Sequence, residues 1–178
     1  MPLTRRSPDA AGDPGPVQIA GEAHANHIPV NNPATNIEVR FDVLGVPRPQ
    51  GSKRAFAVNG KARLAESGGT AVAAWRNAVA DKARAVAGEH GTFSTAVSVR
   101  VAFVFPMPAS RTRAQHNAGM IPKTTAPDID KLLRAMFDGF TAGGLIRDDA
   151  LIVEVASTKV ELSGGWSGAS VTISEVAR

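Results

Sequence analysis

Residues 127–149 read PDIDKLLRAMFDGFTAGGLIRDD, and the interpretation of the whole chain starts from this stretch. Apolar residues recur in it at spacings of three and four, which predicts an amphipathic helix over residues 128–140. Gly143-Gly144 is a typical helix stop. The apolar face contains Ile129, Leu132, Leu133, Met136, Phe137 and Phe140, and it must pack on a sheet. One acidic pair, Asp128 and Asp130, opens the helix, and a second pair, Asp148 and Asp149, follows it.

The segments around this helix predict the rest of the fold. Alternation of apolar residues is typical of strands at residues 37–46, 96–105, 151–162 and 169–176. The last two flank Gly164-Gly165 and are predicted to pair as an antiparallel hairpin. A second helix is predicted over residues 70–87, with Thr70 as its N-cap, Gly88 as its stop and Trp75 in the core. The predicted fold class is α+β, with a small mixed sheet of about four strands packed by two helices in the order β-α-β-α-β-β.

Two long connections carry many cations. Residues 47–63 contain Phe56 among five Lys or Arg side chains, and Asn59-Gly60 predicts a tight turn. This connection is either a solvated surface loop or an arm that contacts phosphates. Residues 109–126 contain cations and no acid, and no periodicity predicts an element there. A stretch of that length without structure of its own is usually functional or disordered.

Composition limits the class of protein. The 178 residues suit one domain, and the hydrophobic share of 43% is normal for a globular protein. There is no apolar run of membrane-helix length, no secretory signal and no cysteine, which fits a reducing cytoplasm. The net charge of +4 permits binding to a phosphate backbone without requiring it. Residues 1–35 are predicted to be a disordered tail before a domain over residues 36–178.

The acids that flank the central helix are candidates for a metal site. Residues two apart in an extended segment point the same way, so Asp128 and Asp130 can be presented together. Two close carboxylates are unfavourable unless a cation lies between them, and their oxygens suit Mg²⁺ or Mn²⁺. The glycine turn leads the chain back toward the sheet, so we expect Asp148 or Asp149 to approach Asp130. From spacing alone, capping of the helix and turn formation explain the same acids better than a metal site does.

The motifs PDIDKLLRAMFDGF and GLIRDDALIVE resemble those of the RusA-type Holliday junction resolvases, which are common in phages and prophages. The segments VPRPQGSKRAF and AWRNAV are similar to those of phage members, so the resemblance covers about residues 37–176. It implies a homodimeric, Mg²⁺-dependent endonuclease, with Mn²⁺ as an alternative ion, that cuts four-way DNA junctions by paired nicks during recombination and repair. It also implies a phage- or prophage-encoded protein of the bacterial cytoplasm, with no membrane partner.

The resemblance assigns roles to single residues. Asp128, Asp130 and Asp149 match the catalytic, metal-binding acids, and Asp148 matches a less essential partner acid. Arg134 stands where the family usually has a catalytically important Lys, and Lys131 where it often has Asn. We expect these departures to change the rate or the substrate preference rather than the class, because Arg binds phosphate as a fork and does not readily donate a proton. The cations predicted to contact the DNA backbone are Arg48, Lys53, Arg54, Lys61, Arg63, Arg111, Arg113, Lys123 and Lys131.

Two other functions stay open at this point. A DNA-binding protein that recognises junctions without cutting them, such as a decayed prophage copy, keeps affinity for DNA without cleavage. A plain α+β interaction module uses its acids only as caps and turns. Metal-dependent cleavage separates the nuclease from both, and salt-sensitive DNA binding separates the two alternatives from each other.

Overall fold

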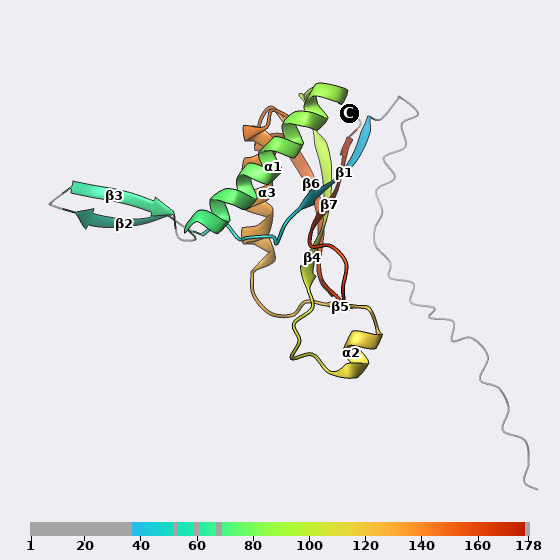
Figure 1. The fold of residues 1–178 in the computed structure, drawn as a ribbon. Helices are drawn as coiled ribbons and strands as arrows, with labels where there is room; N and C mark the ends of the chain where they lie inside the picture. The colour runs from blue at the N-terminus through green and yellow to red at the C-terminus, as the bar shows by residue number, and fades with distance from the viewer. Residues whose placement is uncertain (1–36, 52, 59–60, 67–68, 177–178) are drawn as a thin grey trace, which may run out of the picture. The chain divides into compact units, whose positions relative to one another are not determined.

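The computed structural model describes residues 37–51, 53–58, 61–66 and 69–176, with the backbone alone for 53–58 and 61–66. These residues belong to one compact unit, Asn32–Arg178. They form a five-stranded sheet in the order β1-β7-β4-β6-β5 and a two-stranded sheet, β2-β3 (Figure 1). The tail predicted at residues 1–35 and the turn predicted at Asn59-Gly60 lie outside the described residues.

The elements confirm the predicted α+β class with its mixed sheet. Along the chain they are β1 (Glu38–Leu44), β2 (Lys53–Val58), β3 (Lys61–Glu66), α1 (Gly69–His90), β4 (Val97–Pro106), α2 (Arg113–Asn117), β5 (Met120–Pro122), α3 (Ile129–Ala142), the 3₁₀ turn η1 (Asp149–Leu151), β6 (Ile152–Leu162) and β7 (Gly168–Glu175). Within the described ranges, no helix is both long enough and apolar enough to cross a membrane.

The hairpin predicted from the last two strands is wrong. Strand β4 lies between them, parallel to β6 and antiparallel to β7. Residues 163–167 therefore cross the end of β4 over two strand spacings, roughly 10 Å, which five extended residues can span. Alternation and a glycine turn predict that two strands exist and where the chain bends, but they do not predict which strands become neighbours.

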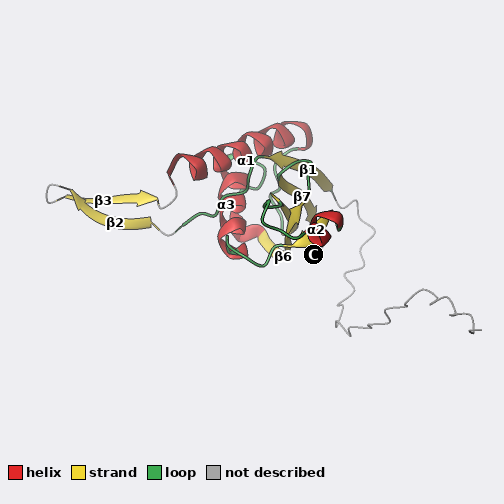
Figure 2. Cartoon of the chain, turned by 60° about the horizontal axis from the view of Figure 1, so that its bottom comes forward, coloured by secondary structure: helices red, strands yellow, loops and turns green. Residues whose placement is uncertain are grey.

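The predicted core is confirmed. Alternate residues of β1, β4 and β7 point to one face of the sheet, and α1 and α3 cover that face (Figures 1 and 2). Helix α3 contributes its predicted apolar face, and Trp75 of α1 is buried as expected. The least exposed core side chains include Val79, Val97, Val99, Phe103, Leu132, Met136, Phe140 and Ile173.

The ends of α1 differ from the prediction. The helix begins at Gly69, so Thr70 lies in its first turn, and Gly88 lies inside the helix. The stop is Gly91, which has φ +87° and donates its N–H to the carbonyl of Ala87 at 2.8 Å. A glycine lowers helix propensity anywhere, but it ends a helix where the backbone turns to positive φ.

The connection over residues 109–126, predicted to lack structure, contains α2 and β5. Helix α2 begins with a capping box in which Thr112 and Gln115 exchange backbone and side-chain hydrogen bonds. It has no buried residue, which explains why no apolar periodicity predicted it. Strand β5 pairs with β6 through three residues only, at the edge of the sheet.

The other basic connection, over residues 47–63, is also partly structured. Part of it forms the β2-β3 pair, in which Val58 lies opposite Lys61.

Helices α1 and α3 approach each other at Gly139 of α3 and at Gly143, its C-cap residue. A Cβ atom on Gly143 would lie 2.5 Å from the carbonyl oxygen of Ala80 and 2.6 Å from Cβ of Ala83. A Cβ atom on Gly139 would lie 2.5 Å from Cγ1 of Val79. Since backbone cannot move aside as a flexible side chain does, the closeness of the two helices depends on Gly143 having no side chain.

We expect Gly143→Ala to destabilise the fold by roughly 1–3 kcal/mol, the usual range for overpacking a tight contact. Its φ of −81° suits any residue, so the effect is steric rather than conformational. Gly88→Ala is the matched control, because a Cβ there meets nothing within 4 Å and α1 is helical at that point. That control gains about 0.5–1 kcal/mol from helix propensity. Urea unfolding of both variants measures the contrast, and equal free energies of unfolding would contradict the packing argument.

Candidate functional site

The position of Asp128 is set by Lys159 of β6. The Lys159 ammonium donates to the carbonyl oxygens of Thr125, at 2.8 Å, and Pro127, at 2.7 Å. The backbone N–H of Lys123 donates to the carbonyl of Lys159 at 3.0 Å. Residues 123–127, which contain the cis Ala126–Pro127 peptide bond, are thus held against the sheet. Asp128, the N-cap residue of α3, follows directly.

Asp128 pairs with a cation instead of capping the helix. Its side chain makes no capping hydrogen bond and accepts from the Lys131 ammonium at 2.6 Å. This hydrogen bond, helped by the two charges, lowers the pKa of Asp128 and raises the pKa of Lys131. The carboxylate therefore stays ionised to a lower pH than an isolated Asp does. Roughly half of each of the two side chains is exposed. Asp130, in the first turn of α3, is also exposed.

A pocket of about 480 Å³ opens beside Asp128. It lies between residues 46–49 on one side and residues 126–128 with Lys131 on the other, and Phe105 and Lys123 also line it. We call it the Asp128 pocket. It brings together four residues that the sequence analysis singled out, namely Asp128, Arg48, Lys123 and Lys131. The first is a predicted metal ligand and the other three are predicted DNA contacts.

Gln50 attaches the first wall of this pocket to α3. Its backbone N–H donates to the carbonyl of Lys131 at 3.0 Å, and its side-chain amide donates to Asp138 at 2.6 Å. Gln50 is buried, and its Oε1 atom has no hydrogen-bond partner among the described residues. The segment over residues 47–50 therefore runs along α3 and is not a freely moving loop.

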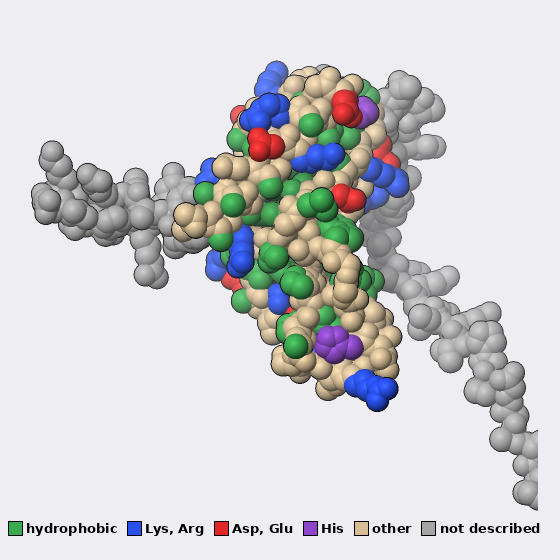
Figure 3. All heavy atoms as spheres, in the orientation of Figure 1, with side chains coloured by type: hydrophobic (Ala, Val, Ile, Leu, Met, Phe, Trp, Pro, Cys, Tyr) green, Lys and Arg blue, Asp and Glu red, His purple; other side chains and the backbone are tan. Residues whose placement is uncertain are grey.

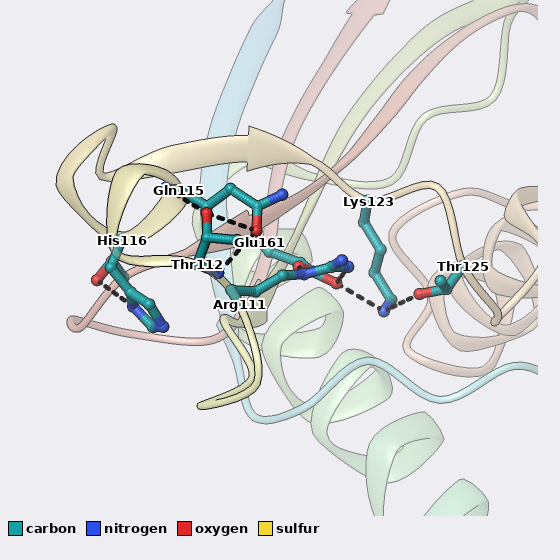
Figure 4. A network of polar contacts seen from close by, with 8 residues as sticks. Arg111, Thr112, Gln115, His116, Lys123, Thr125 and Glu161 are labelled. Carbon is teal, nitrogen blue, oxygen red and sulfur yellow. Dashed lines mark hydrogen bonds and ion pairs between the residues drawn. The ribbon is translucent and has the colours of Figure 1, made fainter.

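A buried carboxylate anchors the other basic connection (Figure 4). Glu161 of β6 is fully buried and accepts two hydrogen bonds from the Arg111 guanidinium, at 2.7 and 3.0 Å. Lys123 donates to the same carboxylate at 3.2 Å and to Thr125 at 2.9 Å. Charged hydrogen bonds, those from Arg111 first, lower the pKa of Glu161 despite its burial. Arg111 and Lys123, predicted as DNA contacts, thus have a carboxylate partner inside the protein.

The second acidic pair is positioned by a different contact. Phe93, just before β4, exchanges backbone hydrogen bonds with Leu145 and Arg147. Asp148 then accepts from the N–H of Ala150 at 2.9 Å and caps η1, which is the turn role that the sequence analysis left open for it. Asp149 lines a shallow depression together with Asp138, Thr141 and Ala142 of α3 and Arg76 of α1.

The two acidic pairs do not form one cluster. Among the described residues, no three His, Asp or Glu side chains lie close enough to hold a metal ion together. The reason is the length of α3, because Asp149 lies beside Asp138, eight residues and about 12 Å along the helix from Asp130. Mg²⁺ commonly takes one or two carboxylates and completes its shell with water and substrate phosphate. Carboxylate oxygens suit that chemistry, and the choice of ligands stays a prediction.

The remaining predicted cations are dispersed. Arg134 and Arg113 are exposed, on α3 and at the start of α2. Lys53 and Arg54 belong to β2, and Lys61 and Arg63 to β3; their side chains lie outside the description. On the face shown in Figure 3, the visible Lys and Arg side chains are scattered among acidic and apolar ones.

Sequence analysis missed Lys159 and Glu161. They occupy alternate positions of β6, opposite Phe103 and Phe105 in the register with β4. Both therefore share the face of the sheet to which the core side chains of β4 point. A lysine and a glutamate two residues apart in a predicted strand, on its inward face, were the available signal. The contact between Gln50 and Asp138 carried no such signal, because it joins residues 88 positions apart.

Carboxylates and cations around a pocket, at the end of a helix that packs on a mixed sheet, suit an enzyme that acts on phosphate esters. The model of the family Endodeoxyribonuclease RusA matches residues 45–174, most of the 178-residue chain. The chain belongs to this family of DNA endonucleases. The match includes every candidate site residue from Arg48 to Asp149. No curated protein matches the sequence.

We expect Glu161→Gln to lower the free energy of unfolding at neutral pH by about 3 kcal/mol, since it leaves two cations beside a neutral group in a buried site. The folded-state pKa of Glu161 lies below its ordinary value of 4.5. Its contribution is therefore complete above pH 4.5 and is lost as the pH falls through the folded-state pKa. Urea unfolding across this range should show the gap between variant and wild type closing in acid. Glu154→Gln, at an exposed position of β6, is the control, and a gap independent of pH would contradict the ionic account.

Lys159→Met should lower the free energy of unfolding by roughly 2 kcal/mol, because two backbone carbonyls lose a charged donor. Lys159→Arg should recover part of this loss, since a guanidinium can also donate to two oxygens. Lys82→Met, at an exposed position of α1, controls for loss of a surface charge. Thermal and urea unfolding measure the differences. Identical stability of Lys159→Met and wild type would show that residues 123–127 are held by other contacts.

Proposed function

We propose that this protein is a Mg²⁺-dependent endonuclease that resolves four-way DNA junctions by paired nicks, as a homodimer, during recombination and repair. The observation that carries the proposal is the RusA family match over residues 45–174. The Asp128 pocket supports it, because it places three cations beside one of the expected catalytic acids. A two-fold dimer matches the pseudo-symmetry of a four-way junction. A phage or prophage origin and action in the bacterial cytoplasm complete the proposal.

The proposed metal ligands are Asp128, Asp130 and Asp149, with Asp148 in a lesser role. The bound ion, Mg²⁺ or Mn²⁺, would supply a hydroxide near neutral pH and offset charge on the phosphate that is cut. Lys131 pairs with Asp128 and lowers its pKa, so Asp128 is ionised, as a metal ligand must be. With an ion held by Asp128, the Lys131 ammonium would be free to contact the substrate phosphate.

Arg134 has the second role in the proposed chemistry. It is exposed on α3, four residues after Asp130, where its guanidinium can bind a phosphate as a fork. It cannot readily give up a proton, so protonation of the leaving oxygen falls to water or another group. This is the physical reason to expect a rate or a substrate preference that differs from that of members with Lys at this position.

In this proposal the protein binds DNA through contacts between basic side chains and the phosphate backbone of the DNA. The β2-β3 pair contributes Lys53, Arg54, Lys61 and Arg63, and Arg48 contributes from the wall of the Asp128 pocket. Such contacts position DNA with little reading of its sequence, and their affinity falls steeply with salt. Since Arg111 and Lys123 already bind Glu161, we expect them to contribute less to the salt dependence than Arg48.

A non-cleaving, junction-binding protein is the second candidate. The observation that favours it is the distance along α3 between Asp130, in its first turn, and Asp149, which lies beside Asp138. Arg134 and Lys131, which depart from the usual Lys and Asn, point the same way. In this case the cations around Asp128 serve binding alone, and cleavage is absent with Mg²⁺ and with Mn²⁺.

We expect Asp130→Asn to reduce Mg²⁺-dependent nicking of a synthetic four-way junction by about 100-fold or more, since metal charge stabilisation supplies several kcal/mol. Junction binding should be kept or strengthened, because a negative charge near phosphate is removed. The assay uses a labelled junction and a linear duplex, each with Mg²⁺ or EDTA. Asp42→Asn is the matched control, because Asp42 is an exposed acid of β1 that the proposal does not use.

Each result of this assay selects a function. Paired, Mg²⁺-dependent nicks near the junction centre that Asp130→Asn loses and Asp42→Asn keeps support the resolvase. Undiminished cleavage by Asp130→Asn would rule out Asp130 as a metal ligand. Tight junction binding by wild type without cutting in either metal would support the non-cleaving candidate. Absence of salt-sensitive DNA binding would overturn both.

A further inference from the structure

The Asp128 pocket combines two kinds of surface that backbone contact alone does not require. Prolines and aliphatic or aromatic carbons make up most of its lining, contributed by Val46, Pro47, Pro49, Phe105 and Pro127. Cations stand among them. A site that contacts only the phosphates of DNA needs positive charge, but it does not need an apolar pocket.

The size of the hollow limits what can enter it. Its volume of about 480 Å³ lies within the range of about 300–1,000 Å³ typical of pockets that hold one small ligand. A stacked base pair cannot enter a pocket of single-ligand size. A single nucleotide has the matching chemistry, with an apolar ring face for the apolar lining and a phosphate for the cations.

The three cations of the pocket differ in depth: two are exposed at its rim and one is largely buried. Arg48 and Lys131 are exposed, and the Lys131 ammonium, which donates one N–H to Asp128, keeps two others for a phosphate outside the pocket. Lys123 is 11% exposed, and its ammonium lies 5.2 Å from the centre of the Phe105 ring. Thr125 and Glu161 take two of its three N–H donors, which leaves one for a base inside the pocket.

We infer that the Asp128 pocket receives one unpaired nucleotide of the DNA substrate, with its base inside the pocket and its phosphate between Arg48 and Lys131. The inference rests on the proposed function, since it names how that same site takes its substrate. Asp128 lines the pocket, so the phosphate of the captured nucleotide lies next to a proposed metal ligand. Cutting is then coupled to strand positions where a base can leave its stack, and such positions are frequent at the exchange point of a junction and rare in linear duplex.

The test places 2-aminopurine, a fluorescent base that brightens when unstacked, at each position within three nucleotides of the exchange point. Full-length protein is added to saturation in EDTA, which allows binding without cutting. We expect a fluorescence rise of at least threefold at one position. Ala126→Leu, which adds bulk at an exposed lining residue, should abolish that rise at saturation. Ala118→Leu, at the exposed end of α2, is the matched control and should keep it.

A second measurement does not depend on fluorescence. With Mg²⁺, Ala126→Leu should nick the normal junction at least tenfold more slowly than wild type. An abasic nucleotide at the responsive position should restore its rate to within about twofold of wild type, because no base then has to enter. A misfolded variant would not be rescued in this way.

The outcomes separate the inference from the proposed function. Junction binding by wild type without a fluorescence rise at any position would overturn the inference and leave the nuclease intact. A rise that Ala126→Leu keeps would place the unstacked base elsewhere, and it would equally overturn the inference. Failure of wild type to bind the junction at all would overturn the proposed function together with the inference.

Discussion

The site depends on two charged side chains that one strand directs to the same face of the sheet. Lys159 and Glu161 of β6 are two residues apart, so they point the same way. Lys159 holds the carbonyls of Thr125 and Pro127, and Glu161 holds Arg111 and Lys123. A buried carboxylate without a partner is strongly unfavourable, so the chain between residues 111 and 127 cannot leave the sheet without a large loss of free energy. The position of Asp128 follows from that constraint.

Periodicity in the sequence was sufficient to predict the parts of the fold that bury apolar residues in a regular pattern. The two long helices and strands β1, β4 and β7 are of this kind, and α3 buries its predicted stripe. Strand β6 was also predicted from its apolar residues, although Val153 and Val155 are exposed. Periodicity could not predict which strands pair, because the position of β4 between β6 and β7 depends on contacts between residues far apart in the chain. Helix α2 and strand β5 were also missed, since neither has a buried face with a period of its own.

The candidate site was predictable in composition and less so in geometry. Acids and cations were recognisable from their motifs, and the structure gathers Asp128, Arg48, Lys123 and Lys131 around one pocket. The prediction that the two acidic pairs lie close together was wrong, because Asp130 is in the first turn of α3 and Asp149 lies near its C-terminal end. An argument from spacing in the sequence assumes that the residues between the two acidic pairs are flexible. Once they form a helix, they become a spacer of fixed length.

The pairing of β1 with β7 has a consequence for how the protein is made. Glu38, in the first strand of the described domain, lies opposite Ser174, in the last. Strand β7 also separates β1 from β4, so β1 has no place in the sheet until β7 is present. On a ribosome, the N-terminal strand therefore has to wait for almost the whole domain to be synthesised. We expect the sheet to close only after β7 has left the ribosome, with β1 available to chaperones until then.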